Sequence, residues 1–453
     1  MNENKELFEE MPVYKAVVSL VVPTVISQLI TVVYNMADTF FIGQIGDPDQ
    51  VAAVSLCMPL FVLLTGMANL FGIGGSSLIA RSLGEGDLEK AKKVSAFSIW
   101  TAGMVSLLYG ILVFVLRGYL LPAIGANEAT YDFCSRYIFW AVTVGAAPTV
   151  LNAALAHLVR AEGYSRQASF GMAMGGILNM ILDPIFITLL GFEIAGAAIA
   201  TMLSNMAATF YFITLIIRRR KSMALTISPR HYGLGNSIPS EVLLVGLPSC
   251  VMTLMGVLSN VTMNRLMVSY CNEAVAGIGI AKKVDMLAFA IATGMSQGVL
   301  PLIGYNYSAK KFGRMMSAVK ITFIYSLVIA VIGMVFLLTC AGPIVRAFID
   351  DPLTVEYGGR FQRIVCLPGP CISVTMIIIT LFQSVGKKVE PLVLSLLRKG
   401  GFDIPVMFLM NAWIGVNGIA WATPIAEFAS MLVAVLLFIP FWKGLKLELE
   451  TVS

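Results

Sequence analysis

The sequence predicts an all-α integral membrane protein with twelve transmembrane helices in two parallel six-helix repeats. Its composition, its long apolar runs and an internal duplication support this fold class. Of its 453 residues, 58% are hydrophobic and only 13% are charged, and the mean hydropathy is +0.84. Because soluble domains average about 25% charged residues, most of this chain must lie in lipid.

The apolar runs are long enough to cross a bilayer, which takes about 20 residues per helix. They predict spans at 16–42, 51–79, 94–116, 131–156, 168–190, 194–217, 241–269, 275–303, 319–340, 361–384, 390–411 and 415–442. The first run is long and has no small-residue cleavage site after it, so we expect it to remain as a membrane anchor.

Basic residues are concentrated in alternate connections between the predicted spans. The longest basic segment is 218–239, and Lys92, Lys93, Lys310 and Lys311 lie in connections on the same side. Since cytoplasmic loops carry the excess of Lys and Arg, we expect a multi-pass membrane protein with both termini in the cytoplasm. These loops account for the net charge of +5 without a nucleic-acid partner.

The two halves of the chain repeat each other at offsets of 220 to 225 residues. The matches include Pro, Asn, Asp, Thr and Gly in a fixed order. They pair Pro23 with Pro248, Asn35 with Asn260, 160–163 with 383–386, Asp183 with Asp403, and 196–201 with 418–423. The sequence therefore predicts an N-lobe at 1–217, a cytoplasmic linker at 218–239 and a C-lobe at 240–453. Two parallel repeats about a central cavity form one architecture of secondary transporters.

Polar residues interrupt the apolar spans of the N-lobe at one level. Asn179 and Asp183 are four residues apart and share a helix face, and Pro184 leaves the carbonyl of Met180 without a helix partner. The predicted helix directions place Asp38, Asp183 and Thr201 about 8–11 Å below the outer surface.

A carboxylate within a span is costly to bury and tends to mark an ion or substrate path. We therefore predict a cation-coupling site at Asp38, Asn179, Asp183 and Thr201. The oxygen atoms suit sodium, and paired carboxylates equally suit a proton. The structural alternative is that Asp183 caps the kink at Pro184 and Asp38 ends its helix.

The C-lobe places Lys399 where the N-lobe has Asn179, and Asp403 where it has Asp183. An ion pair that neutralises buried charge is the favoured interpretation. Lys282 is predicted to line the cavity with Asp285 or to pair with it, and Glu427 is a further buried acid that could attract a cation. The candidate substrate-cavity residues are Asn35, Met180, Asp285, Lys399, Asp403 and Glu427.

Five motifs resemble the multidrug and toxic compound extrusion (MATE) family, in the bacterial branch of Gram-positive multidrug exporters and the DNA-damage-inducible type. They are Asn35-Met36-Ala37-Asp38, the segment 74–81 with Gly84, the segment 160–163, Asn179 with Asp183 and Pro184, and the segment 196–201. The resemblance covers 10–445 and implies two six-helix lobes of the MOP flippase superfamily. It implies a drug/cation antiporter that exports cationic lipophilic compounds, with the coupling ion, sodium or a proton, at the residues matching Asp38, Asn179, Asp183 and Thr201. Some branches carry a further acid in helices seven and ten, which this chain lacks.

Other function classes fit less well. The loops cannot hold a nucleotide-binding domain, so we expect an ion gradient to drive transport, and no His, Cys or Ser constellation indicates an enzyme. The alternative function is a flippase for lipid-linked precursors, which needs an Arg- and Lys-rich cavity, whereas the N-lobe is acidic. We expect a monomer whose partners are cationic drugs, protons or sodium and the bilayer, with no cofactor beyond a bound sodium ion.

Overall fold

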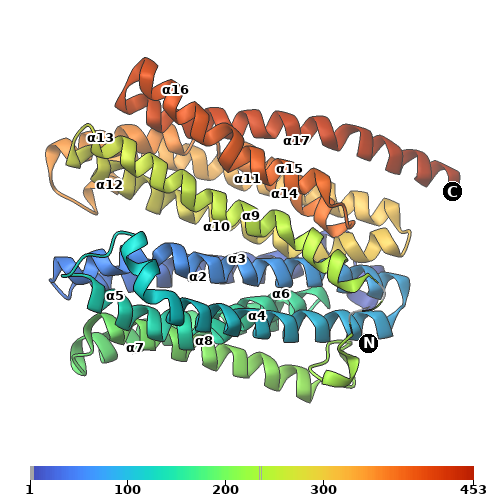
Figure 1. Ribbon diagram of the computed structural model, residues 1–453. Helices are drawn as coiled ribbons and strands as arrows, with labels where there is room; N and C mark the ends of the chain where they lie inside the picture. The colour runs from blue at the N-terminus through green and yellow to red at the C-terminus, as the bar shows by residue number, and fades with distance from the viewer. Residues whose placement is uncertain (1–4, 234, 236, 453) are drawn as a thin grey trace. The chain divides into compact units, whose positions relative to one another are not determined.

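The computed structural model describes residues 5–233, 235 and 237–452, which form helices joined by short connections (Figure 1). It consists of two compact units. The first comprises the chain up to Glu10 and Leu29–Cys250, and the second comprises Met11–Gln28 and the chain from Val251 onward. The units follow the predicted lobes except at two helices, α2 (Val13–Gly43) and α9 (Ile238–Val268), each of which contributes to both units.

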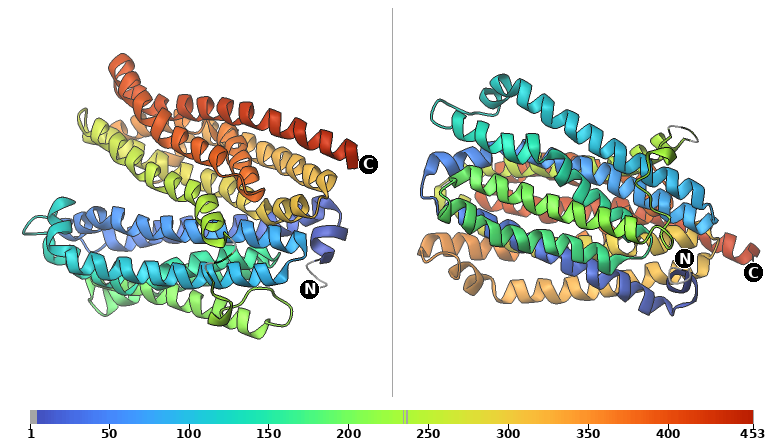
Figure 2. Two further views of the ribbon diagram at one scale, coloured as in Figure 1. Left: turned by 45° about the vertical axis from the view of Figure 1, so that its right-hand side comes forward. Right: turned by 90° about the horizontal axis from the view of Figure 1, so that it is seen from below.

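The first unit holds the later part of α2 and the early part of α9. Between them come α3 (Pro48–Glu85), α4 (Leu88–Ala123), α5 (Tyr131–Ile138), α6 (Ala146–Ala161), α7 (Ser165–Pro184) and α8 (Glu193–Arg218). Helices α3, α4 and α6 pack against one another, and α7 packs against α8 (Figures 1 and 2).

The second unit holds the early part of α2, the later part of α9 and the rest of the helices. These are α10 (Asn272–Ser308), α11 (Phe312–Thr339), α12 (Ala341–Arg346), α13 (Pro352–Val365), α14 (Gly369–Ser384), α15 (Val389–Leu396), α16 (Ile404–Ile414) and α17 (Val416–Val452). Helix α10 packs against α11, α13 and α14, and α17 packs against α14 and α16.

Aspartates cap several helices where the chain turns. The Asp47 carboxylate accepts a hydrogen bond from the Asp49 amide at 3.0 Å, with Pro48 opening α3. The Asp87 carboxylate accepts from the Lys90 amide at 2.9 Å at the start of α4. These side chains satisfy amide groups that have no partner within the helix, so the turns fix where the spans begin.

The all-helical membrane fold is confirmed. Within the described residues, nine helices are long and apolar enough to cross a membrane, and two bent pairs raise the number to as many as eleven. The bent pairs, Tyr131–Val144 with Ala146–Ala161 and Pro352–Val365 with Gly369–Ser384, correspond to the predicted spans 131–156 and 361–384. They turn by 46° and 45°, at matching positions of the repeat.

The predicted span 390–411 differs from the other spans. It is helical throughout but consists of three short segments: α15, a π-helical turn at Leu397–Asp403, and α16. This turn carries Arg398, Lys399 and Asp403, whose charges lower the hydropathy of the run. Twelve spans therefore remain a prediction, while nine to eleven are observed.

Prolines are found beside the π-helical turns in both halves. Pro184 ends α7, and the π-helical turn η3 (Ile185–Leu189) follows it. In the second half, Pro405 lies two residues after the turn at Leu397–Asp403. Because proline donates no amide hydrogen bond, the helix adopts a wider turn at these points, next to Asp183 and Asp403.

Glycines allow the shared helices to approach their neighbours closely. In the first unit, a Cβ atom on Gly246 of α9 would lie 1.8 Å from the Leu70 carbonyl oxygen of α3. In the second unit, a Cβ atom on Gly294 of α10 would lie 2.7 Å from the Val25 Cα atom of α2. Small residues of this kind bring helices together in membranes, and here they hold half of a shared helix in each unit.

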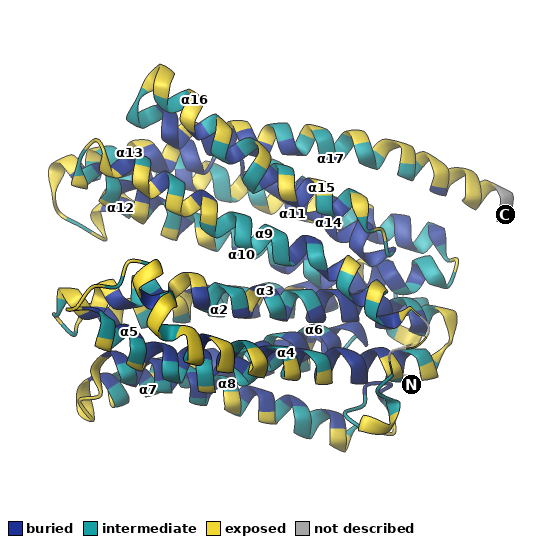
Figure 3. Ribbon diagram, viewed as in Figure 1, coloured by how far each residue is buried: buried dark blue, intermediate teal, exposed yellow. Residues whose placement is uncertain are grey.

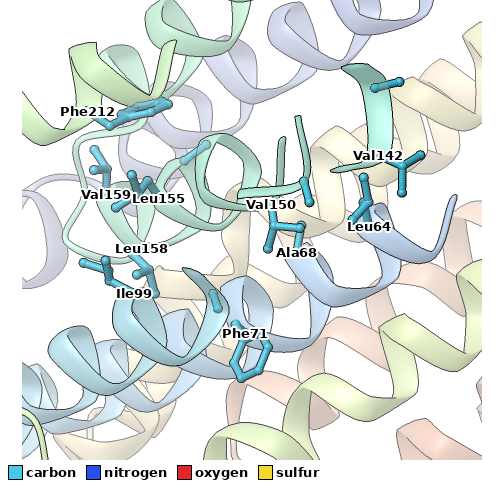
Figure 4. Packing of buried hydrophobic residues seen from close by; sticks show 14 of the residues in the cluster. Leu64, Ala68, Phe71, Ile99, Val142, Val150, Leu155, Leu158, Val159 and Phe212 are labelled. Carbon is cyan, nitrogen blue, oxygen red and sulfur yellow. The ribbon is translucent and has the colours of Figure 1, made fainter. Parts of the chain in front are cut away.

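Apolar side chains form the core and also cover much of the helix surface. Figure 4 shows Leu64, Ala68, Phe71, Val150 and Leu155 packed together in the first unit. Figure 3 shows exposed positions along α17. The exposed hydrophobic residues of this helix include Leu432 and Leu436. An apolar outer surface on helices of this length is what a bilayer requires.

The predicted linker 218–239 is bound to the first unit over much of its described length. Its Thr226 amide donates to the Ser95 hydroxyl, which in turn donates to the Thr226 carbonyl, both at 3.0 Å. The Trp100 indole donates to the Ile227 carbonyl at 2.9 Å. Residues 234 and 236 of the predicted linker lie outside the described residues.

Glu162, in the connection between α6 and α7, also binds this linker. Its carboxylate accepts a hydrogen bond from the Leu225 amide at 2.6 Å. The side chain is 1% exposed, and burial raises the pKa of Glu162 to about 8, an effect that the amides of Leu225 and Ala224 partly oppose. The linker is therefore held along the first unit, and we call its bound segment, residues 225–227, the strap.

Candidate functional site

A cluster of oxygen-bearing side chains joins α7 to α8 in the first unit. The Asn179 amide group donates to the Asp183 carboxylate at 3.2 Å and to the Thr201 hydroxyl at 3.4 Å. Asn179 and Asp183 are buried, at 2% and 0% exposed. The structure thus brings together three of the four residues predicted for cation coupling.

The fourth residue, Asp38 on α2, belongs to the same unit, and its negative charge reaches Asp183. The two charges also reach Tyr137. Asp38 is a partly buried residue, and its Oδ1 atom is buried. Two carboxylates of one unit therefore act on each other within an apolar surrounding.

Three acceptor atoms of this cluster have no hydrogen-bond donor among the described residues. They are Asp38 Oδ1, Asn179 Oδ1 and Asp183 Oδ2. Buried acceptors without donors are costly, and a proton or an oxygen-seeking cation would satisfy them. The cluster can therefore take up a positive charge.

A small cavity adjoins the cluster. Asn179 and Thr201 line it, together with Thr31, Tyr34, Asn152, Met172, Gly175, Gly176, Ser204 and Asn205. Within its lining, the Asn152 amide donates to Asn205 at 2.9 Å, and the Asn205 amide donates to the Thr149 hydroxyl at 3.1 Å.

The sequence analysis missed Tyr34, Asn152 and Asn205. Asn205 lies four residues after Thr201 on one helix face, and that spacing was the signal available for it. Asn152 could have been found as an amide within the predicted span 131–156.

Two of the substrate candidates in the first unit lie outside the lining of this cavity. Asn35 is exposed and Met180 is partly buried. The structure leaves their predicted contact with substrate untested.

The matching part of the second unit is a buried cluster of four charges. The predicted pair of Lys399 and Asp403 is present, with Nζ and Oδ2 at 3.7 Å. Glu427 lies closer to Lys399, at 3.0 Å, and accepts a hydrogen bond from Arg398 Nε at 2.7 Å. The Ser259 hydroxyl donates to Asp403 Oδ2 at 2.6 Å. The cluster neutralises itself, and whether Lys399, Asp403 or Glu427 contacts substrate stays a prediction.

Arg398 is the member whose role the sequence did not indicate. It is 1% exposed, and its guanidinium lies against the sulfur atoms of Met252 and Met376 and over the Phe289 ring. The sequence did not place Arg398 in this cluster, because it is adjacent to Lys399 and two adjacent residues of a regular helix face different directions. Both residues lie in the π-helical turn, and both contact Glu427.

Lys282 and Asp285 form no ion pair with each other among the described residues. The Lys282 ammonium instead donates to the Thr423 hydroxyl at 3.5 Å. Asp285 lies one turn further along α10, at the edge of a separate cavity. Among the described residues, no group of three or more His, Cys, Asp or Glu side chains could hold a metal ion.

A model of the family described as MatE matches the chain twice, at residues 23–185 and at 248–409. The chain belongs to the MatE family. One match falls in each half, which agrees with the internal repeat. The chain is accordingly a membrane transporter rather than an enzyme.

The chain is also similar to curated proteins over nearly its whole length. It is 30% identical over 437 residues to the multidrug export protein MepA of Staphylococcus aureus strain N315, covering 96% of each chain. It has the same identity and coverage with the MepA protein of Staphylococcus saprophyticus.

Solved structures of MATE proteins have the same fold. A crystal structure of a MATE protein in complex with MaL6 superposes with a TM-score of 0.92, at 24% identity, over 98% of this chain and 99% of that one. An outward-facing multidrug resistance MATE transporter of the MOP superfamily gives a TM-score of 0.90, at 24% identity and the same coverage. These likenesses confirm the predicted fold class.

Proposed function

We propose that this protein exports lipophilic cations from the bacterial cell in exchange for protons or sodium ions. The observation that carries the proposal is the set of three buried acceptor atoms without donors at Asp38, Asn179 and Asp183. A cation bound at this cluster supplies a positive charge to these oxygens, and its departure removes that charge. Such a site can couple the state of the protein to an ion gradient.

The relatives support the substrate class. The curated proteins at 30% identity carry the name multidrug export protein. The cavity beside the cluster has methionine and tyrosine in its lining together with amides. Flexible thioethers and aromatic rings adapt to varied apolar cations.

Helix α2 supplies the connection between ion binding and transport. Asp38 lies in the part of α2 that belongs to the first unit, and residues up to Gln28 belong to the second. A cation at Asp38 and Asp183 therefore acts on a helix that both units share. This helix also contains Pro23, where it lacks one internal hydrogen bond. We propose that ion binding bends α2 and expels the drug. We place both termini in the cytoplasm and take the protein to work as a monomer.

Ethidium efflux from proteoliposomes, under a proton gradient and a sodium gradient imposed separately, tests this function. We expect one gradient to drive efflux in the wild type and neither to drive it in Asp183→Asn. The matched control is Asp132→Asn, which changes an exposed aspartate paired with Arg136 on α5 and should transport normally. Absence of efflux under both gradients with folded wild-type protein would contradict the proposal.

A further inference from the structure

We propose that the second unit carries a pocket for an amphiphilic ammonium ion, with the Asp285 carboxylate as its anionic anchor. The pocket is distinct from the Asn179–Asp183 cluster and from the cavity beside it. The class of ligand rests on the proposed function, whereas the existence of the pocket does not.

The pocket is a small cavity, open on one side, that is bordered by α10, α11 and the bend between α13 and α14. Its walls are mainly apolar and include Phe289, Ile291, Ile329, Met334, Leu337 and Ile372. Three polar side chains line it, namely Asp285, Ser326 and Ser373. Cavities with apolar walls and a few placed polar groups are typical of small-molecule sites.

Asp285 forms no hydrogen bond or ion pair with any residue of the described chain. The nearby cations have other partners. Arg398 and Lys399 bind Glu427, and Lys282 donates to Thr423. Charged groups within reach of Asp285 are Lys282, Lys399 and Arg398, which are positive, and Glu427, which is negative. An acid within a membrane span needs a partner, and this one borders a cavity.

Ser326 of α11 is a second and independent indication of a ligand. It is 2% exposed, and its hydroxyl oxygen has no hydrogen-bond partner among the described residues. Ser326 lines the same cavity as Asp285. An ammonium group donates several hydrogen bonds and carries a positive charge, so it complements both a carboxylate and a hydroxyl oxygen.

The pocket opens at the exposed side of α11. Ile329 is 42% exposed there, and a Cβ atom on Gly333 would have no heavy atom within 4 Å. The surface of α11 carries further exposed apolar residues, Ile332 and Val335 among them. An amphiphile dissolved in the bilayer can therefore reach the pocket with its alkyl chain along these walls and its ammonium group at Asp285.

The competing account makes Asp285 only a counter-charge for Lys282, three residues away on α10. In that case the loss of the carboxylate changes stability without changing the binding of a ligand. A substitution that fills the pocket leaves the charges of Asp285 and Lys282 in place. It should weaken ligand binding if Asp285 anchors a ligand, and leave binding unchanged if Asp285 is only a counter-charge.

Radiolabelled dodecylammonium, bound at equilibrium to the full chain in nanodiscs, separates these accounts, with protein-free nanodiscs as background and dodecanol as the uncharged competitor. We expect Asp285→Asn to weaken binding by about tenfold or more, which corresponds to about 1.4 kcal/mol. Gly333→Leu should weaken it similarly by filling the rim. Gly279→Leu, on α10 in open space outside the pocket lining, should bind as the wild type does.

Unchanged binding in both Asp285→Asn and Gly333→Leu would overturn the pocket. So would competition by dodecanol as strong as that of unlabelled dodecylammonium. The assay uses no gradient, so it is separate from the efflux test. Binding that depends on Asp285 in a protein without gradient-driven efflux would leave the pocket standing and contradict only the proposed export.

Discussion

Asp183 and Asp403 occupy matching positions in the two halves of the chain, but their surroundings differ in charge. Both aspartates keep one buried oxygen without a hydrogen-bond donor among the described residues. In the first unit, Asp183 receives one hydrogen bond, from Asn179, and no described cation pairs with it. In the second unit, Asp403 faces the Lys399 ammonium and receives a hydrogen bond from Ser259. One cluster lacks a positive charge, and the other contains two.

This difference shows how a duplicated helix pair can acquire two roles. We infer that the residue four positions before the aspartate decides which role each copy has, because it contacts the aspartate in both units. On this proposal, asparagine leaves room for an exchangeable cation. Lysine supplies a permanent cation, and Glu427 with Arg398 completes a neutral group that can hold the helices together.

The largest effect should come from giving the first unit the lysine of the second. In Asn179→Lys the ammonium should pair with Asp183 and replace the coupling cation permanently. We expect gradient-driven ethidium efflux to fall to the level of protein-free liposomes. The measurement is efflux from proteoliposomes at matched protein content.

The control for that variant is Met174→Lys, on the same helix and outside the cavity lining. It shows how far a lysine elsewhere in α7 reduces efflux. Efflux at the wild-type rate in Asn179→Lys would mean that this cluster does not couple transport to the gradient.

The second largest effect should be on stability, in Glu427→Gln. This change leaves Arg398, 1% exposed, without its carboxylate. Removing one partner of a buried ion pair costs about 3–5 kcal/mol, which thermal unfolding in nanodiscs should detect.

The double variant Glu427→Gln with Arg398→Gln should recover part of that loss, because Lys399 and Asp403 then remain as a balanced pair. The exposed pair of Arg360 and Glu356 provides the comparison, and Glu356→Gln should cost about 1 kcal/mol or less. Equal losses in the buried and exposed variants would contradict the structural role of the cluster.

A smaller loss is expected for Ser259→Ala, which removes the hydroxyl donor to Asp403. A hydrogen bond to a charged group contributes about 1.5–3 kcal/mol. Ser269→Ala is the matched control, because the Ser269 hydroxyl is exposed and bonds only to the Leu266 carbonyl. A loss in Ser259→Ala no greater than that in Ser269→Ala would show that Asp403 does not depend on this donor.

The smallest expected effect is on the pH dependence of stability, through the contact of Glu162 with the strap. Glu162 of the first unit matches Val385 of the second, so only one unit buries a carboxyl group at this position. Its pKa is raised from 4.5 to about 8, so folding takes up a proton between these pH values. Stability should therefore fall as pH rises through this window, by at most about 1.4 kcal/mol per pH unit.

Glu162→Gln should remove that slope. Thermal unfolding between pH 5 and pH 9 measures it, and trypsin cleavage of the linker reports whether the strap loosens at high pH. The exposed Glu128→Gln serves as control. A slope that survives in Glu162→Gln would assign the pH dependence to other groups.

Much of this arrangement could be predicted from the sequence, and for physical reasons. Apolar runs and helix periodicity are local properties, so the spans and the pairing of Asn179 with Asp183 follow from spacing alone. The pair of Lys399 and Asp403 followed in the same way. Thr201 could be placed only because the repeat and the loop charges fixed the helix directions.

The rest depends on distant contacts and on departures from regular helix geometry. Arg398 of the π-helical turn contacts Glu427, which is 29 residues away in the chain, and no local spacing rule predicts that contact. The amides of Asn152 and Asn205 meet only because α6 packs against α8. Lys282 and Asp285 were predicted either to line the cavity or to pair; they do not pair, and Lys282 donates to Thr423 instead.

The most direct test of the central claim is to count cations released when drug binds. Ethidium is added to the purified protein in nanodiscs in weak buffer, and released protons and sodium ions are measured. The account predicts about one cation released per ethidium bound in the wild type, none in Asp183→Asn, and wild-type release in Asp285→Asn. Release that persists in Asp183→Asn would contradict the assignment of coupling to the first unit.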